Sequence, residues 1–376
     1  MLIASIADLH ARGKDLHAFT DQLRSFTREC VDRRVHLVLI AGDIFERPEV
    51  GDKDASTGAI AQPLIDTFIE LGYQQAITVI MIPGNHDTSG VGSLDALHIF
   101  EGIPNVYVIH EPGQYGNDLL FSAIFPFSYP SLPAIYCIPW MYTPGTTPAA
   151  EIQKLLTKYP LPTTGTSILL HHIEVIGGVQ SGSSTCEGKA NSWQISPAEL
   201  DALPFSHIVG GHFHRRQPFY VGALRQCGFS AVGDPAGFET WDSETGLVEF
   251  VELNAAPRHH IIDVPINHPL PDPSVFNALD KYRIDLHERH PRDQEQRIET
   301  PDGRIAIKHI LPPREERVHR VKNIPEDATQ NPRDLIEIYA KAKDKDAAFV
   351  AEIHSVYDGV MADTTKSEKE FTSCLK

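Results

Sequence analysis

The sequence predicts an α/β fold in which two β-sheets pack together and helices flank them. Residues 1–85 alternate short apolar runs with longer amphipathic stretches, which is typical of strand–helix–strand units in a layered sheet. From about residue 105 the apolar runs become shorter and turn residues more frequent, which favours β-rich units. Polar residues that can bind metal ions follow several of these runs, so the expected chemistry lies at strand ends.

Three buried strands are predicted in the first 85 residues, at 3–7, 35–41 and 77–82. Residues 15–34 carry apolar side chains at three- and four-residue spacing, as an amphipathic helix does. Residues 62–71 are also expected to be helical, with Gly72 ending the helix. This alternation predicts a sheet with helices packed on its face.

The later part of the chain is predicted to form shorter strands, at 106–109, 119–125, 134–138, 167–170, 207–209, 218–222, 246–253 and 259–266. Near residue 268 a turn-rich segment leads into a highly charged region with one good strand, at 305–311. Residues 331–343 are predicted to form a capped helix, and the last residues a mobile tail.

The composition is that of an ordinary globular protein of 376 residues with 41% hydrophobic residues. This length accommodates two domains, or one large domain with a cap. The N-terminus lacks the basic region of a signal peptide, and no apolar stretch reaches membrane-spanning length. Five widely spaced cysteines favour a reduced, cytoplasmic protein. The net charge of -17 argues against non-specific nucleic-acid binding.

Side chains that can bind metal ions follow the predicted strands in this order: Asp8, His10, Asp43, Asn85, His86, Asp87, His171, His172, His212 and His214. Carboxylate, imidazole and amide ligands together suit an ion such as manganese, iron or zinc. Two such ions, about 3.5–4 Å apart, can clamp the attacking and leaving oxygens of a displacement at phosphorus. The pattern therefore predicts a two-metal phosphoesterase.

Several of these motifs are ambiguous when each is taken alone. Asp8 and His10 can reach one ion because alternate residues of an extended strand point the same way, but such pairs are also common in surface turns. Asp43 can bridge two ions, with one oxygen to each, or serve as an ordinary strand-end residue or helix cap. His212 and His214 again share one face of an extended segment and follow two glycines.

The Gly-Asn-His-Asp run at residues 84–87 is more specific. Asn85 offers a neutral oxygen ligand to a metal ion. His86 can lie over the scissile phosphate without binding metal and donate a proton to the leaving oxygen. Asp87 is expected to orient the His86 ring and to favour its protonated form.

With these motifs in this order, residues 1–255 resemble the calcineurin-like metallophosphoesterases. The resemblance implies the two-sheet metallophosphoesterase fold, followed here by a small C-terminal α+β cap. It also implies two sets of metal ligands that share one residue. One set is Asp8, His10, Asp43 and His214, and the other is Asp43, Asn85, one histidine of 171–172, and His212.

Three segments resemble more closely the SbcD-type nuclease subunits of double-strand-break processing complexes and their phage relatives: HHIEVIGG from residue 171, CIPWMY from 137 and YVGALRQCGFSAVGDPAGF from 220. The first segment selects His172 as the ligand and leaves His171 outside the ligand set. The likeness implies a nuclease domain over 1–267, a DNA-facing cap over 268–325, and a helical partner-docking segment with a tail over 326–376.

The same likeness implies a nuclease subunit of DNA repair or recombination, with dsDNA exonuclease and ssDNA endonuclease activity. The expected ions are two Mn²⁺, with Fe²⁺ or Zn²⁺ as alternatives. The expected partners are DNA, an SbcC-like coiled-coil ABC-type ATPase and a second copy of the chain, without a membrane. Arg215 and Arg216 could contact the DNA backbone or be solvated loop charges. Glu46 stands where some relatives have a further histidine, which leaves His86 to stabilise the transition state.

Two other functions remain open at this point. A small-substrate phosphodiesterase or a phosphomonoesterase could use the same fold and site, because a fold does not determine the substrate. A non-catalytic scaffold relative would be expected to have lost metal ligands, whereas every ligand position is filled here.

Overall fold

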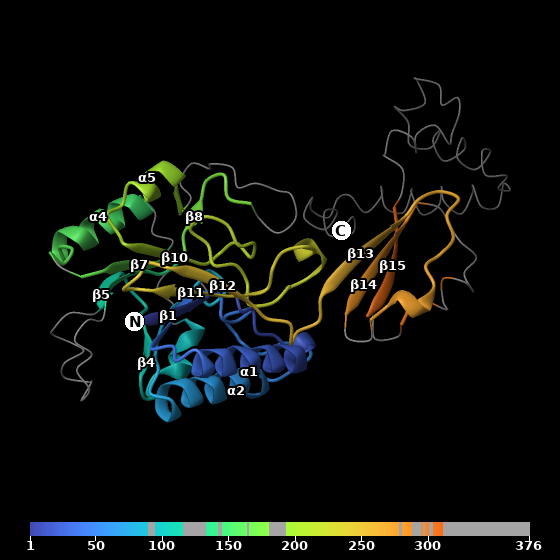
Figure 1. Cartoon of the computed structure of the whole chain (residues 1–376), viewed down its shortest axis with the longest axis horizontal. Coiled ribbons are helices and arrows are strands. Elements are labelled where there is room, and N and C mark those ends of the chain that lie inside the picture. Colours follow the sequence, from blue (N-terminus) through green and yellow to red (C-terminus); the bar gives the residue numbers. More distant parts are fainter. Residues whose placement is uncertain are drawn as a thin grey trace, which may run out of the picture. The chain divides into compact units, whose positions relative to one another are not determined.

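Two mixed β-sheets lie between layers of helices in the computed structural model of the chain (Figure 1). The structure describes residues 1–88, 95–115, 133–141, 145–163, 165–179, 193–277, 280–287, 295, 298–300 and 304–310. The strands of these ranges form no closed barrel. The predicted fold class, two packed sheets flanked by helices, is confirmed.

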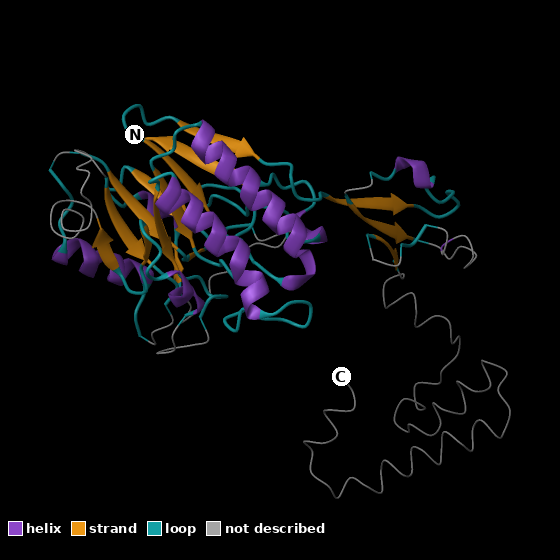
Figure 2. Ribbon diagram, turned by 90° about the horizontal axis from the view of Figure 1, so that it is seen from below, coloured by secondary structure: helices purple, strands orange, loops and turns teal. Residues whose placement is uncertain are grey.

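The larger sheet contains β1 (Leu2–Ile6), β2 (Leu37–Ala41), β3 (Thr78–Ile82), β4 (Val106–Val108), β11 (Gly237–Asp242) and β12 (Val248–Glu252). Its strand order is β12-β11-β1-β2-β3-β4, with β1 to β4 parallel and β11 and β12 antiparallel to their neighbours. Two helices, α1 (Leu16–Asp32) and α2 (Thr57–Phe68), cover one face of this sheet (Figure 2). Phe19 and Phe26 of α1 are fully buried there, because the apolar stripe of the helix faces the sheet.

The smaller sheet contains β5 (Gly113–Tyr115), β6 (Ala134–Ile138), β7 (Ser167–His171) and β10 (His207–Gly210), in the order β10-β7-β6-β5. Helices α4 (Pro148–Lys158) and α5 (Pro197–Asp201) pack on its outer face. Between the sheets, Leu39 and Ile80 of the larger sheet belong to one buried cluster with Cys137 and Leu170 of the smaller one. The layer order is therefore helix, sheet, sheet, helix.

Shorter elements complete the described chain. They are the strand pair β8 (Glu174–Val175) and β9 (Gln194–Ile195), and the 3-10 helices η1 (Gly13–Asp15), η3 (Ala96–Phe100), η4 (Phe229–Ala231) and η5 (Pro273–Val275). A third sheet joins β13 (His259–Val264), β14 (Lys281–Leu286) and β15 (Ile305–His309) in that order. None of the helices in the described ranges has the length and apolar character needed to cross a membrane.

The chain divides into two units. The first holds residues 1–264, 268–285 and 290–308, and the second holds 265–267, 286–289 and 309–376. The predicted domain boundaries near residues 267 and 325 remain predictions. The predicted strand at 119–125, the helix at 331–343 and the tail lie outside the described residues.

Two predicted elements differ from the structure, and several observed elements were not predicted. The helix expected at 62–71 begins at Thr57, where the Ser56 hydroxyl caps it by accepting a hydrogen bond from Ala59 N–H. It continues into the π-helix η2 (Ile69–Gln74), so Gly72 does not end it. A Cβ at Gly72 would lie 2.3 Å from Pro104 O, so this glycine permits close packing instead.

The segment 218–222 is a turn and not a strand, because Tyr220 N–H donates to Gln217 O and Phe219 has a φ of 71°. Conversely, β14 was not predicted. Its buried residues include Tyr282, Ile284 and Leu286, so its apolar side chains alternate with polar ones instead of forming a continuous run. Strand β11 and helices α4 and α5 were also missed.

Candidate metal centre

The C-terminal ends of parallel strands in both sheets carry the predicted metal ligands. Asp8 and His10 follow β1, Asp43 follows β2 and Asn85 follows β3 in the larger sheet. His172 follows β7, and His212 and His214 follow β10, in the smaller sheet. The structure brings these seven side chains into two groups that touch through Asp43.

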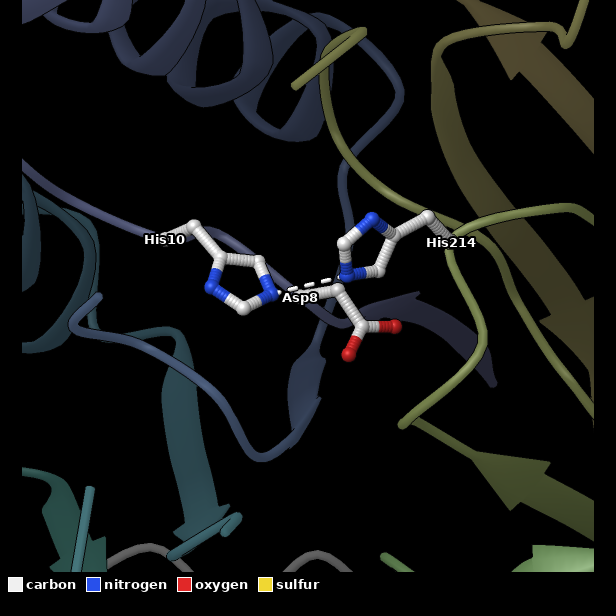
Figure 3. A group of neighbouring side chains, drawn as sticks. All are labelled: Asp8, His10 and His214. Atoms are coloured by element: carbon white, nitrogen blue, oxygen red, sulfur yellow. Dashed lines mark hydrogen bonds between the residues drawn. The ribbon is translucent and has the colours of Figure 1, made fainter. Parts of the chain in front are cut away.

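The first group consists of Asp8, His10 and His214, whose ligand atoms lie within 4.8 Å of one another. Figure 3 shows the two imidazole rings facing each other, with Nε2 of His10 2.9 Å from Nε2 of His214. Asp8 Oδ1 accepts a hydrogen bond from His212 N–H, whereas Asp8 Oδ2 is buried and has no hydrogen-bond partner among the described residues. Facing imidazole nitrogens beside an unpaired carboxylate oxygen are suited to a shared cation.

The second group consists of Asp43, His172 and His212, again with ligand atoms within 4.8 Å of one another. Asn85 completes this group, because its Oδ1 lies 3.1 Å from His172 Nε2 and 2.9 Å from His212 Nδ1. Two imidazoles, one carboxylate and one amide oxygen therefore converge. Asp43 and His212 are close enough to share an ion.

Asp43 connects the two groups through a single oxygen. Asp43 Oδ2 lies 3.8 Å from His10 Nε2 in the first group and 3.4 Å from His172 Nε2 in the second. Asp43 Oδ1 instead accepts a hydrogen bond of 2.8 Å from His86 N–H. The expectation of one oxygen for each ion remains a prediction, and in the structure the second oxygen holds the turn that carries His86.

Four of the ligand residues have backbone conformations that side chains rarely adopt. The φ angles of Asp8, His10, Asp43 and His212 are 53°, 45°, 53° and 114°. These values exclude the extended strand ends on which the two-residue spacing argument rested. His212 and His214 in fact lie in different groups, as the family resemblance implied. Strained conformations of this kind concentrate at functional sites.

Two glycines make the close approach of the loops possible. Gly42 has a φ of 84°, and a Cβ there would lie 2.4 Å from His172 Nδ1. A Cβ at Gly84 would lie 2.2 Å from Asp43 Oδ1. Any side chain at either position would push a ligand out of place.

The imidazoles have lone pairs available for metal binding. Burial lowers the pKa of His212 and of His214 to about 4, so both rings are neutral at physiological pH. His172 Nδ1 donates a hydrogen bond of 2.6 Å to Ala41 O, which directs Nε2 toward the site. Although burial opposes it, the negative charge of Asp43 raises the pKa of His172 to about 9. A cation would displace that proton.

His86 lies beside both groups, with a ring nitrogen within 4.8 Å of ligand atoms of His10 and Asp43. Its Nδ1 donates a hydrogen bond of 3.0 Å to Glu46 O, which orients the ring. The prediction that Asp87 orients His86 is therefore wrong. The Asp87 carboxylate is fully buried and accepts hydrogen bonds from the main-chain N–H groups of Ile44, Phe45 and Gly84. Asp87 fastens the two ligand loops together.

Glu46 and Trp140 contact the ligands but were not predicted to do so. Glu46 Oε2 lies 3.3 Å from His10 Nδ1, so this one residue holds His10 with its side chain and His86 with its carbonyl group. Trp140 stacks on the His212 ring, with centroids 5.4 Å apart and planes 19° apart. The position of Glu46, three residues after Asp43, is the sequence signal that could have identified it.

The remaining predicted residues lie outside the ligand groups. His171 is fully buried, and its Nδ1 accepts a hydrogen bond of 3.2 Å from Ile173 N–H. Arg215 lies 3.4 Å from Asp234, and Arg216 lies 3.0 Å from Glu239. Both arginines are partly exposed, at 49% and 38% of their side-chain surface.

A family profile described as calcineurin-like phosphoesterase matches residues 1–216, more than half of the chain. Among curated proteins, none matches the sequence. A solved structure described as a novel archaeal phosphodiesterase is 11% identical with a TM-score of 0.29, and the match covers 67% of this chain and 100% of that one. GAP50, described as the anchor in the inner membrane complex of Plasmodium, is 13% identical with a TM-score of 0.40, and that match covers 69% and 90%.

Proposed function

We propose that the chain, which belongs to the calcineurin-like phosphoesterase family, is a Mn²⁺-dependent DNA nuclease subunit. The observation that supports a two-metal site is the pair of ligand groups joined by Asp43 Oδ2. The donor set of imidazole, carboxylate and amide oxygen fits Mn²⁺, and Fe²⁺ or Zn²⁺ could replace it. The free cysteines among the described residues, Cys30, Cys137 and Cys227, agree with a reducing, cytoplasmic setting.

The first ion would be held by Asp8, His10, Asp43 and His214, and the second by Asp43, Asn85, His172 and His212. Two bound divalent ions would supply Lewis acidity, which lowers the pKa of water and offsets negative charge on the phosphodiester. The chain itself would position these ions through loops that Asp87 and Glu46 hold in place.

His86 is the proposed proton donor. Water attacks phosphorus and loses a proton to solvent, and the bond from phosphorus to the leaving sugar oxygen breaks. His86 gives a proton to that oxygen and regains one from solvent. The hydrogen bond from Nδ1 to Glu46 O leaves the Nε2 atom of His86 available for this transfer. The same bond places a proton on Nδ1, because a carbonyl group can only accept.

The substrate and partners follow from the likeness to SbcD-type subunits. DNA would enter over the metal site, with Arg215 and Arg216 exchanging Asp234 and Glu239 for backbone phosphates. Residues 268–325 would face the DNA, and residues 326–376 would dock on an SbcC-like ATPase. A second copy of the chain is also a proposed partner.

The test compares substrates under Mn²⁺ with the full chain, alone and with an SbcC-like ATPase from the same genome. We expect cleavage of linear duplex and single-stranded DNA, and about a 10²-fold loss in His86→Ala. His17→Ala serves as the matched control, because the His17 side chain is 93% exposed on α1. Rapid hydrolysis of p-nitrophenyl phosphate or its bis-ester, with DNA left intact, would instead establish the small-substrate alternative.

A further inference from the structure

A second cluster of metal-capable side chains lies around the 3-10 helix η3, outside the centre described above. It consists of Asp95, His98, Glu101 and His110, here named the η3 cluster. Ligand atoms of Asp95, His98 and His110 lie within 4.8 Å of one another. Glu101 Oε1 lies 2.8 Å from His98 Nδ1 and 2.9 Å from His110 Nε2. Two imidazoles and two carboxylates thus meet within one short stretch of chain.

The two histidines of the η3 cluster present their nitrogens to the same oxygen. Their rings stack with centroids 4.1 Å apart and planes 14° apart. His98 uses Nδ1 and His110 uses Nε2 to contact Glu101 Oε1. These three atoms come from three different side chains, and both nitrogens lie close to the same carboxylate oxygen. Such an arrangement provides three of the four ligands that zinc takes.

Asp95 completes the arrangement from behind His110. Asp95 Oδ2 lies 2.5 Å from His110 Nδ1, while Asp95 Oδ1 accepts a hydrogen bond of 2.9 Å from Leu97 N–H. Asp95 itself is 9% exposed, and these two contacts hold its carboxylate. A carboxylate that holds one ring nitrogen directs the other toward a metal ion, and this is the usual support of a ligating histidine.

We propose that the η3 cluster is a further metal site, which binds one zinc-type divalent ion through His98, Glu101 and His110. Asp95 orients His110 in this site. The side chains of His98 and His110 are 35% and 25% exposed, so an ion can enter from solvent and keep a water ligand. The two carboxylates balance the charge of a divalent ion. The competing arrangement is an ion-pair cluster in which a protonated His110 takes the place of the metal.

The position of the η3 cluster gives such an ion a structural effect. Ala96 N–H, next to Asp95, donates a hydrogen bond of 2.9 Å to Asp87 O. Phe100, the last residue of η3, stacks on Phe45 with ring centroids 5.7 Å apart. Both contacts lead to the loops that carry the central ligands. An ion in the η3 cluster would therefore stiffen the support of the turn that bears His86.

Zinc stoichiometry tests the site in the full chain. The central site is first disabled with His10→Asn, Asp43→Asn and His212→Asn, which preserve side-chain size and remove two of the four ligands from each group. After equilibration with Zn²⁺ and removal of excess, elemental analysis is expected to find one ion per chain. Adding His98→Asn and His110→Asn to this background should reduce that to none, whereas adding His17→Asn should leave it unchanged. Absence of zinc from the background protein, or retention in the cluster variant, would overturn the proposal.

Thermal unfolding provides a second readout that does not depend on activity. In the same background, Zn²⁺ should raise the midpoint only while the η3 cluster is intact, because a ligand that binds the native state stabilises it. Glu101→Gln is the milder variant if the double histidine variant fails to fold, since the Glu101 side chain is 52% exposed. We expect it to weaken zinc binding at least about tenfold. Unchanged affinity in Glu101→Gln would contradict the assignment.

Discussion

The two sheets supply different chemistry to the central metal site. The larger sheet contributes all of its oxygen ligands, from Asp8, Asp43 and Asn85, together with His10. The smaller sheet contributes imidazoles alone, from His172, His212 and His214. Negative charge is thus concentrated on one side of the site and imidazole nitrogens on the other. A pair of cations between the sheets would satisfy both.

The concentration of carboxylates on the larger sheet destabilises the protein when no ions are bound. Burial, together with the nearby charge of Asp43, raises the pKa of Asp8 to about 6, although His172 opposes this shift. His172 is the imidazole of the smaller sheet that lies against Asp43, and it takes up a proton in response. Buried charges without full compensation destabilise a fold. The buried negative charge of the larger sheet therefore destabilises the ion-free protein, and bound metal ions would compensate this charge.

The largest expected effect comes from the residue that joins the two groups. Asp43→Asn removes the charge of Asp43 Oδ2, which faces His10 on one side and His172 on the other. We expect phosphodiesterase activity to fall about 10³-fold, and bound Mn²⁺ to fall below two ions per chain. Steady-state hydrolysis and elemental analysis measure the two quantities. Asp32→Asn, at an exposed end of α1, is the matched control, and equal activity in both variants would contradict the role of Asp43.

Within the smaller sheet, the adjacent residues His171 and His172 allow a buried structural histidine to be compared with a predicted metal ligand. His172 Nε2 faces Asp43 and Asn85, so His172→Asn should reduce activity about 10²-fold and weaken Mn²⁺ binding. His171 packs inside the sheet, so His171→Asn should lower stability while leaving activity per folded molecule near that of the wild type. The measurement is activity normalised to the folded fraction. A larger loss in His171→Asn would reverse the assignment.

The fold and the place of the site could be predicted because buried parallel strands read as continuous apolar runs. Strands β1, β2 and β3 end two or three residues before Asp8, Asp43 and Asn85, so their common edge identifies where ligands gather. Strand β14 was missed because its apolar residues alternate with charged ones. The η3 cluster was missed because its four residues follow no strand-end pattern.

The finer geometry of the site could not be derived from spacing. The spacing argument placed His212 and His214 on one face, but a φ of 114° at His212 turns them into different groups. The orientation of His86 depends on the main-chain carbonyl group of Glu46. Every residue has such a group, so the sequence does not show which one contacts His86. Contacts between loops from distant parts of the chain are fixed by tertiary structure and not by local pattern.

A smaller effect is expected at Glu46, whose carboxylate supports His10, the imidazole ligand of the larger sheet. Its carboxylate lies 3.3 Å from His10 Nδ1, and this contact raises the pKa of His10 against the effect of burial. Glu46→Gln removes the charge and keeps the main-chain carbonyl that holds His86. We expect affinity for Mn²⁺ to fall about tenfold, with most of the maximal rate recovered at saturating metal. Titration of activity with Mn²⁺ measures the affinity and the maximal rate separately. A lower rate at saturating Mn²⁺ would show that Glu46 does more than support His10.

The smallest expected effect concerns the free energy of unfolding, and its sign depends on whether metal is bound. Asp8 Oδ2 is buried without a partner among the described residues, so Asp8→Asn should stabilise the ion-free protein by about 1–2 kcal/mol at pH 8. Because the pKa of Asp8 is raised to about 6 in the folded state, the wild type loses stability as pH rises from about 4 through 6. The advantage of the variant should therefore shrink toward pH 4.

Urea unfolding in chelator at pH 4.5 and pH 8 measures this difference, with Asp32→Asn as the exposed control. Saturating Mn²⁺ should reverse the order of stability, because the wild type gains binding energy that Asp8→Asn loses. If Asp8→Asn were the less stable protein in chelator at pH 8, the charge on the larger sheet would not be a cost that metal relieves. The separation of carboxylates on one sheet from imidazoles on the other would then have no effect on the stability of the ion-free protein.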